Sequence, residues 1–306
     1  MLFRSNGKGK LEKGAIPSLL SDALSVSFDP NVGHDYLEQF EDRYEYYHRV
    51  QEKLPFDLDF FNRITKNGVP KKTLNVVMAG VGVGKSLCMC HFAASYLNQG
   101  KNVLYITLEL AEEEVSKRID ANLLNITFED LMNLPKDLYK KRIDNLKAKT
   151  TGKLIVKEYP TSSASAAHFR SLLNELHLKK NFVPDAIMVD YLNICASSRI
   201  KPGNGVNSYT YIKAIAEELR GLAVEYNVPV WSATQLTRSG YGSSDPDMTD
   251  TSESFGLPAT ADFFVALITN ETMEQLKQVQ VKQLKNRYND PSINKKFVIE
   301  IGRAHV

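Results

Sequence analysis

The stretch "MAGVGVGKSLCMC", from Met78 to Cys90, decides the fold of this chain. The apolar run over residues 74–79 has the length and composition of a buried strand. Residues 86–100 carry apolar side chains at helical spacing and end at Gly100, a typical helix stop. A glycine-rich segment therefore connects a strand to a helix. This order predicts a phosphate-binding loop in an α/β protein.

The loop follows the pattern G-x-x-x-x-G-K-[ST], with alanine in place of the first glycine. Glycines allow several backbone N–H groups to surround one anion, and the start of the helix adds partial positive charge. We expect Lys85 to contact the β- and γ-phosphates of a nucleoside triphosphate and Ser86 to bind its Mg²⁺. A chance glycine-rich turn is the alternative. The predicted binding loop comprises Ala79, Gly80, Val81, Gly82, Val83, Gly84, Lys85 and Ser86.

The composition narrows the class of protein. The chain has 306 residues, 43% of them hydrophobic, which suits one large α/β domain or one domain with an extension. A net charge of +2 argues against a polycationic nucleic-acid coat, so any nucleic-acid contact is expected to be local. Three cysteines favour a reducing compartment. The absence of an 18-residue apolar run predicts no membrane span.

The two ends of the chain look foreign. Residues 1–5 and 301–306 resemble translations of a sequencing adapter, so we exclude them from fold reasoning and expect a fragment of a longer reading frame. Ordinary frayed termini are the alternative. Between them we expect a linker helix and a lead-in helix in residues 6–52, followed by an ATPase domain over residues 53–300. The amphipathic stretch "IPSLLSDAL", residues 16–24, is the expected linker helix.

Strand-like and helix-like segments alternate from Leu74 onward. The long helix expected over residues 208–227 places four apolar residues on one face: Ile212, Ile215, Leu219 and Leu222. This alternation predicts a mostly parallel sheet with helices on both faces and a ligand at the carboxyl ends of the strands. Short links between the last three strands predict an antiparallel or mixed edge. The expected strands after the first are residues 102–108, 153–159, 185–192, 228–233, 262–268, 279–285 and 296–301.

Three polar residues follow expected strands and fit the needs of triphosphate hydrolysis. Hydrolysis needs a carboxylate to position Mg²⁺, a group that activates water and a sensor of the γ-phosphate. Asp190 ends an apolar run and is the candidate for the metal. Glu109 is the candidate base, with a solvated or capping glutamate as the alternative. Gln235 is the candidate sensor, although a polar loop residue would look the same.

Two cations stand late in the chain, in "VKQLKNRYND". Lys285 and Arg287 follow an alternating strand, so both are expected to project to the same side. They lie far along the chain from the phosphate loop and could complete the active site of a neighbouring subunit. An arginine supplied in this way contributes roughly 10³–10⁵ in rate. An exposed basic strand end is the alternative.

Five segments in this order carry a resemblance to a known family: "MAGVGVGKS", "ITLELAEEEVSKRI", "IMVDYLNI", "SATQLTR" and "LKNRYND". Together they resemble the motor domain of DnaB-class replicative DNA helicases, and the closer resemblance is to the replicative helicase of large tailed bacteriophages. It extends through residues 14–30 and 169–185. The resemblance implies a RecA-like P-loop NTPase, preceded by a linker helix that docks on the neighbouring motor domain.

The resemblance also implies a ring of six identical subunits that hydrolyses ATP between neighbours, moves on single-stranded DNA and unwinds the duplex. It implies a primase and a helicase loader as partners of the full-length protein, in the cytoplasm of an infected bacterial host. By the matching motifs, Lys85 and Ser86 would bind the phosphates and Mg²⁺, and Asp190 would support the metal. Glu109 would be the catalytic base, Arg118 would contact the nucleotide, and Gln235 would couple the state of the phosphate to DNA. Lys285 and Arg287 would reach into the active site of the neighbouring subunit.

Single-stranded DNA would thread the central pore of such a ring. The candidate DNA-binding loops are residues 197–209 and 237–258. Their basic residues Arg199, Lys201 and Arg238 suit contacts with the phosphate backbone, which are independent of sequence. The second loop is rather acidic, and solvated loop charges are the alternative for each of the three cations.

Other functions remain open at this point. A RecA-type recombinase filament would use ATP to hold DNA, a P-loop kinase would transfer phosphate to a small molecule, and a remnant would bind nucleotide without turnover. The linker helix and the Lys285–Arg287 pair favour the ring, and no arginine-rich lid supports a kinase. Because we expect this fragment to lack the family's amino-terminal domain and the C-terminal edge after residue 300, we expect weak ATP hydrolysis and no unwinding from it.

Overall fold

The computed structural model describes residues 35–48, 52–201, 203, 206–236, 247 and 256–302. Contacts within the chain divide it into two units, Met1–Gln51 and Glu52–Val306. The first unit contains α2 (Phe40–His48), a helix with an acidic first turn. The expected linker helix at residues 16–24 lies outside the described residues, as do 1–5 and 303–306.

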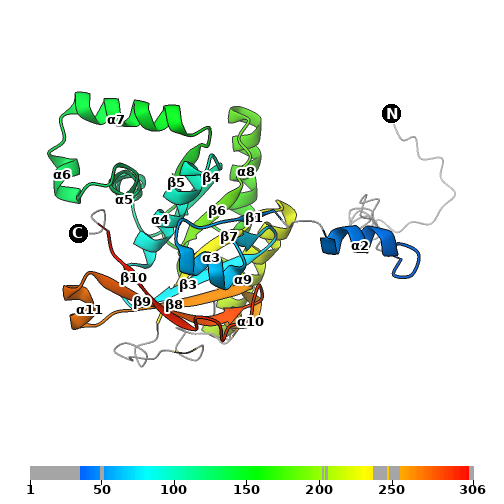
Figure 1. The fold of residues 1–306 in the computed structure, drawn as a ribbon. Helices are drawn as coiled ribbons and strands as arrows, with labels where there is room; N and C mark the ends of the chain where they lie inside the picture. Colours follow the sequence, from blue (N-terminus) through cyan, green and yellow to red (C-terminus); the bar gives the residue numbers. More distant parts are fainter. Residues whose placement is uncertain are drawn as a thin grey trace, which may run out of the picture. The chain divides into compact units, whose positions relative to one another are not determined.

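The second unit is built around an eight-stranded sheet with the order β10-β9-β8-β3-β7-β6-β4-β5 (Figure 1). Its strands are β3 (Leu74–Ala79), β4 (Val103–Thr107), β5 (Leu154–Glu158), β6 (Ala186–Asp190), β7 (Val230–Gln235), β8 (Phe263–Ile268), β9 (Gln278–Asn286) and β10 (Lys296–Glu300). A small antiparallel pair, β1 (Lys53–Leu54) with β2 (Val69–Pro70), precedes it.

Helices connect most of these strands. They are α3 (Asp59–Thr65), α4 (Lys85–Asn98), α5 (Glu112–Leu124), α6 (Phe128–Met132), α7 (Lys136–Lys149), α8 (Ala166–Lys180), the 3₁₀ helix η2 (Leu192–Ile194), α9 (Ser208–Glu225), α10 (Gly256–Thr260) and α11 (Glu271–Gln275). Capping side chains determine where several of these helices begin. The Asn207 side chain, for example, accepts the Thr210 N–H at 2.8 Å and so caps α9.

Six neighbouring strands, from β8 to β5, run parallel, and β9 is antiparallel to both β8 and β10. The predicted α/β class and the predicted antiparallel edge are therefore confirmed. One feature escaped the sequence pattern. Phe264 pairs with Lys285 but Val265 pairs with Gln283, so Leu284 is the extra residue of a β-bulge.

Both faces of the sheet are covered, as predicted. On one face Leu74, Val76 and Met78 of β3 pack in a cluster that also holds buried residues of α8 and α9. On the other face Val77 and Ala79 join a cluster with α3, α4 and α5. The four residues predicted to line one face of α9 are all buried: Ile212, Ile215, Leu219 and Leu222. Both layers thus hold the parallel strands in fixed register.

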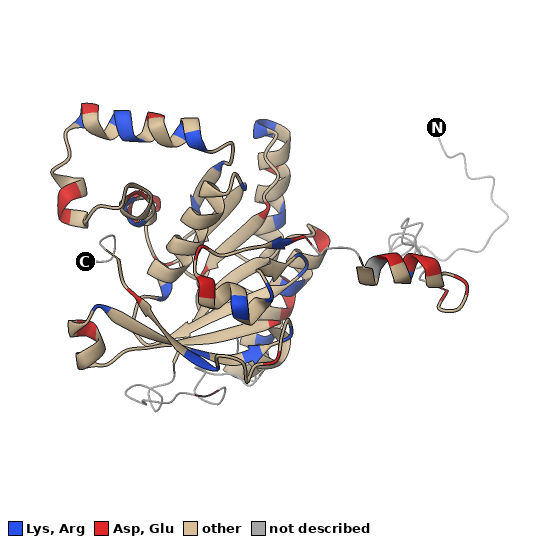
Figure 2. Ribbon diagram, in the orientation of Figure 1, with Lys and Arg blue, Asp and Glu red and all other residues tan. Residues whose placement is uncertain are grey.

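Charge is spread over the described chain. Lys and Arg occur on many helices and strands, usually with Asp or Glu on the same element (Figure 2). No helix among the described residues is long and apolar enough to cross a membrane.

Candidate active site

The glycine-rich loop joins β3 to α4 at the carboxyl edge of the sheet. Gly82 has φ of +80° and Gly84 has φ of +107°, values that L side chains rarely adopt. A Cβ atom at either position would meet nothing closer than 3.9 Å, so conformation rather than space requires glycine there. The Cys88 N–H donates to the Gly84 carbonyl, so the N–H groups just before it have no acceptor within the helix. The loop therefore presents free donors to an anion.

Lys85, the first residue of α4, points across the sheet edge. Its side chain is only 9% exposed, and its Nζ lies 2.8 Å from Glu109 Oε2. The ammonium also lies 4.4 Å from the centroid of the Tyr191 ring. The structure thus brings together the predicted phosphate-binding lysine and the predicted base.

Glu109 stands two residues beyond the end of β4. The preceding residue, Leu108, donates its N–H to the Asp190 carbonyl at 2.8 Å and accepts the Thr161 hydroxyl at 2.8 Å. These two bonds fix the segment between the ends of β4 and β6. Glu109 therefore lies beside the candidate metal carboxylate.

Asp190, the last residue of β6, is fully buried. Its Oδ2 accepts the Tyr105 hydroxyl at 3.0 Å, whereas the buried Oδ1 has no hydrogen-bond partner in the described structure. Burial raises the pKa of Asp190, and the nearby Ser86 hydroxyl and Lys85 ammonium oppose that rise. An unsatisfied carboxylate oxygen beside a hydroxyl fits Mg²⁺, which prefers oxygen ligands.

Within the described ranges, no cluster of three or more His, Cys, Asp or Glu side chains could hold a metal alone.

Gln235 ends β7, and the parallel register pairs it with Ala79 at the start of the loop. Its side chain is partly exposed. The preceding Thr234 hydroxyl donates to Asn193 Oδ1 at 2.8 Å, which links β7 to the segment after Asp190. The predicted sensor thus lies next to the predicted phosphate loop.

Lys285 and Arg287 lie at the opposite edge of the sheet. Lys285 Nζ donates to the carbonyl oxygens of Pro258 (2.7 Å) and Ala259 (2.9 Å). Arg287 Nη1 donates to Asp262 Oδ1 at 2.6 Å, and the Asp262 N–H in turn bonds the first residue of β3. The six residues of β3 span roughly 16 Å between this edge and the loop. These cations are therefore separated from the phosphate loop of their own chain.

Arg118 lies on α5, where its Nη1 donates to the carbonyl oxygen (2.7 Å) and a carboxylate oxygen (3.2 Å) of Glu114. Its predicted contact with nucleotide stays a prediction.

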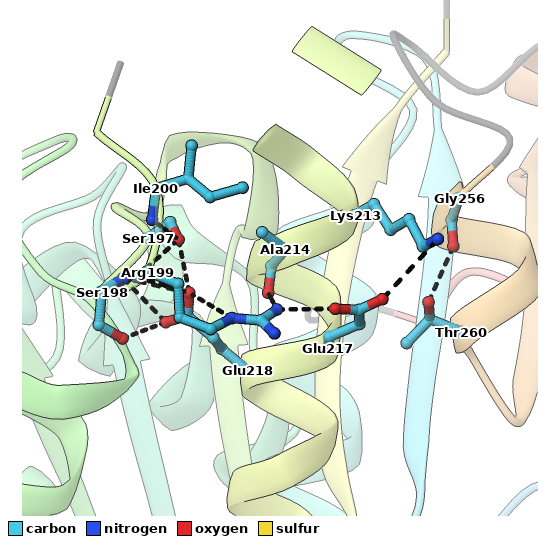
Figure 3. Close-up of polar contacts among 10 residues, drawn as sticks. All are labelled: Ser197, Ser198, Arg199, Ile200, Lys213, Ala214, Glu217, Glu218, Gly256 and Thr260. Carbon is cyan, nitrogen blue, oxygen red and sulfur yellow. Dashed lines mark hydrogen bonds and ion pairs between the residues drawn. The ribbon is translucent and has the colours of Figure 1, made fainter. Parts of the chain in front are cut away.

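The loop after β6 is tied to α9 (Figure 3). Arg199 Nη2 donates to the Ala214 carbonyl at 3.0 Å and to Glu217 Oε2 at 2.7 Å. The buried Glu218 carboxylate accepts the Ser197 hydroxyl and the Ser198 N–H. These hydrogen bonds, together with the Arg199 N–H, give Glu218 a lowered pKa, because they outweigh desolvation, the largest single influence.

The three residues predicted to contact DNA differ in their surroundings. Arg199 is engaged with acidic side chains, Lys201 is exposed, and Arg238 lies outside the described residues. Their role in DNA binding stays a prediction.

Sequence reasoning missed several residues that shape the site. Tyr105 bonds the candidate metal carboxylate, Tyr191 lies against the Lys85 ammonium, Asn193 links two strand ends, Glu218 holds a loop, and Asp262 binds Arg287. A tyrosine inside an apolar strand needs a partner for its hydroxyl, and this was the available clue. The other four contacts depend on tertiary packing.

Comparisons with known proteins show the family to which this chain belongs. Residues 54–303 match the family described as "DnaB-like helicase C terminal domain". This chain belongs to the DnaB-like helicase C-terminal domain family. It is 50% identical over 295 residues to the "DnaB-like replicative helicase" of Enterobacteria phage T4, covering 95% of this chain and 62% of that protein. It is 27% identical over 208 residues to the "Replicative DNA helicase DnaB" of Helicobacter pylori, covering 66% of this chain and 41% of that protein.

Solved structures share the fold. One describes a DnaB-like replicative helicase and its interactions with primase, with a TM-score of 0.67 at 19% identity, covering 89% of this chain and 66% of that one. Another is described as an ATPase domain, with a TM-score of 0.66 at 17% identity, covering 85% of this chain and 92% of that one. The DnaB-like chain described here spans 62% of the phage T4 relative and 41% of the Helicobacter pylori relative.

Proposed function

We propose that this chain is the ATP-driven motor domain of a replicative DNA helicase. In this proposal, it hydrolyses ATP with Mg²⁺ between the subunits of a hexameric ring, translocates on single-stranded DNA and unwinds the duplex. The observation that carries the proposal is the convergence of Lys85, Glu109, Asp190 and Gln235 at one edge of the sheet. Membership of the DnaB-like family supports the same reading.

The side chains suggest a division of labour. The triphosphate would compete with Glu109 for the Lys85 ammonium, which lies 2.8 Å from that carboxylate. The displaced carboxylate would then be free to accept a proton from the attacking water. Ser86 and Asp190 would hold Mg²⁺, which neutralises charge on the β- and γ-phosphate oxygens.

Gln235 would report the state of the γ-phosphate. Its register partner is Ala79 in the phosphate loop, and its neighbour Thr234 bonds Asn193 beyond the metal carboxylate. A shift at the phosphate could therefore reach the segment that continues into the loop at residues 197–209, where single-stranded DNA would bind.

A subunit of this kind would need a neighbour. Lys285 and Arg287 lie at the edge away from their own phosphate loop, so we infer that they act on the nucleotide of the next subunit. Repeated head-to-tail contacts of this type form a ring when the rotation between neighbours closes, as we propose here, and a helical filament when it does not. Arg118 would contact the nucleotide after leaving Glu114.

The full-length protein would also use a primase and a helicase loader. A solved DnaB-like relative is described together with its interactions with primase, which supports the first of these. The site of action would be the cytoplasm of the infected bacterial host.

ATP hydrolysis by the 306-residue chain, measured with and without single-stranded DNA, tests this proposal. We expect hydrolysis that DNA stimulates and that Lys85→Ala abolishes. The control is Lys147→Ala, an exposed lysine on α7 that should keep full turnover. Turnover that does not respond to DNA would favour the kinase alternative, and the absence of turnover would favour the remnant. Turnover that survives Lys85→Ala would contradict the role given to the phosphate loop. The named relatives, all replicative helicases, favour the ring motor over a recombinase filament.

A further inference from the structure

One buried carboxylate lies where β3, β8 and β9 meet. Asp262, just before β8, has a side chain that is 5% exposed. Its Oδ2 accepts the Leu74 N–H at 3.0 Å, and its own N–H donates to the Leu74 carbonyl at 2.8 Å. Asp262 is therefore fixed to the first residue of the strand that ends in the phosphate loop.

Two arginines converge on this carboxylate. Arg220 from α9 donates Nε to Oδ2 at 3.1 Å and Nη2 to Oδ1 at 3.2 Å. Arg287 donates Nη1 to Oδ1 at 2.6 Å, and its backbone N–H donates to the Asp262 carbonyl at 3.0 Å. The side chain of Arg220 remains 40% exposed and that of Arg287 remains 48% exposed. A rigid anion thus holds two cations at the surface.

The cluster keeps one net positive charge, because two guanidinium groups share one carboxylate. It opens onto a hollow of about 580 Å³ between α9 and α10, which is lined by Glu217, Arg220, Gly221, Val224, Glu225, Ala259, Thr260 and Arg287. Lys285 is held separately, by two neutral carbonyl oxygens of α10. Asp262 therefore determines the orientation of Arg287 but not that of Lys285.

We propose that Asp262 is a positioning residue for Arg287. It holds the guanidinium in the orientation that enters the neighbouring subunit's phosphate site, and the bidentate Arg220 contact locks the carboxylate itself. This inference rests on the between-subunit role given to Arg287 above. An arginine ordered before assembly avoids the entropic cost of ordering it there. Misplacement of a reacting group by about 1 Å can cost roughly 10²-fold in rate.

A double-mutant cycle in the 306-residue chain tests this role. The variants are Asp262→Asn, Arg287→Ala and the pair combined, and the measurements are kcat and KM for ATP with single-stranded DNA present. We expect Asp262→Asn to lower kcat by about 10- to 100-fold with KM unchanged. Combining it with Arg287→Ala should add no further loss, because Asp262 acts through Arg287.

The control is Glu225→Gln, which lines the same hollow but pairs with Arg170 at 2.6 Å. It should leave kcat unchanged. Urea unfolding of each variant measures damage to the fold separately.

Three results would overturn the inference. The first is a kcat of Asp262→Asn within twofold of that of the parent chain. The second is that Asp262→Asn lowers kcat by the same factor in the Arg287→Ala background as it does alone, which would mean that Asp262 acts on the fold. The third is full turnover by Arg287→Ala alone, which would instead remove the between-subunit role on which the inference rests.

Discussion

The two ends of β3 carry opposite kinds of site. At its carboxyl end, Lys85 and Asp190 are buried and meet groups from other strands of the same chain. At its amino end, Arg287 and Arg220 are about half exposed around one buried aspartate. The first end is shaped to bind an anion, and the second presents cations at the surface.

Under the proposed between-subunit role of Arg287, one strand would serve two active sites. The carboxyl end has glycine conformations and free N–H groups that suit an anion, but Arg287 of the same chain is held at the other edge. The amino end has the arginine, whereas the phosphate loop lies at the far end of the strand. Roughly 16 Å of strand separates the two ends, which supports the proposal that a complete site combines the carboxyl end of one subunit with the amino end of another.

The largest expected effect comes from the amino end. Arg287→Ala should lower DNA-stimulated hydrolysis by about 10³-fold or more, because a trans-acting arginine contributes on this scale. ATP affinity, measured with a fluorescent analogue, should stay unchanged, since the phosphate loop is intact. Arg142→Ala, an exposed arginine on α7, is the control. Weaker nucleotide binding in Arg287→Ala at protein concentrations too low for assembly would indicate that the arginine serves its own chain.

The next effect comes from the carboxyl end. Glu109→Gln should lower hydrolysis by about 10²–10⁴-fold, because the amide cannot accept the proton of water. Its loss should not depend on protein concentration. Glu113→Gln, an exposed neighbour on α5, should be silent. If Glu109→Gln kept more than about a tenth of the turnover, another group would have to be the base.

Asp190→Asn, also at the carboxyl end of the sheet, should change stability and activity in opposite directions. The raised pKa of Asp190 means that the folded state disfavours its charge, so the ionised carboxylate destabilises the fold at pH values above that pKa. Replacing it with a neutral amide should raise the free energy of unfolding while hydrolysis is lost. Urea unfolding at neutral pH, beside Asp144→Asn as the control, measures this. A less stable Asp190→Asn would contradict the account.

The smallest expected effect concerns the loop beside α9. Glu217 holds Arg199 at 2.7 Å, so Glu217→Gln should release that cation for phosphate. We expect the affinity for single-stranded DNA to rise by about threefold, the scale of an exposed ion pair. Fluorescence anisotropy at several salt concentrations measures the affinity, with Glu175→Gln on α8 as the control. A gain that persists in Arg199→Ala would show that Arg199 is not the group released.

Much of the fold was accessible from sequence, for physical reasons. Buried parallel strands read as apolar runs, so β3 was placed at its observed bounds, and the burial of α9 followed from its periodicity. The placement of Asp190 and Glu109 at one edge followed from strand order. The register between strands could not be predicted from the sequence. The hydrogen bond from Tyr105 to Asp190 and the bulge at Leu284 depend on that register, so both were missed.

The candidate site was accessible only in part. Motif spacing identified the residues at the carboxyl edge, because each follows its own strand directly. The partners of Arg199 and Arg287 were not accessible, since Glu217 and Asp262 carry no local pattern that marks them as anchors. Such contacts depend on how α9 packs against the sheet.

Mixing two inactive variants tests the split site most directly. Lys85→Ala leaves intact the groups at the amino end of β3, and Arg287→Ala leaves intact those at the carboxyl end. Each alone should be inactive, whereas an equal mixture should regain activity, because about a quarter of head-to-tail interfaces would then combine both intact ends. Recovery that rises with total protein concentration is the predicted result. Turnover by Arg287→Ala alone, or no recovery in the mixture at any concentration, would contradict a site shared between subunits.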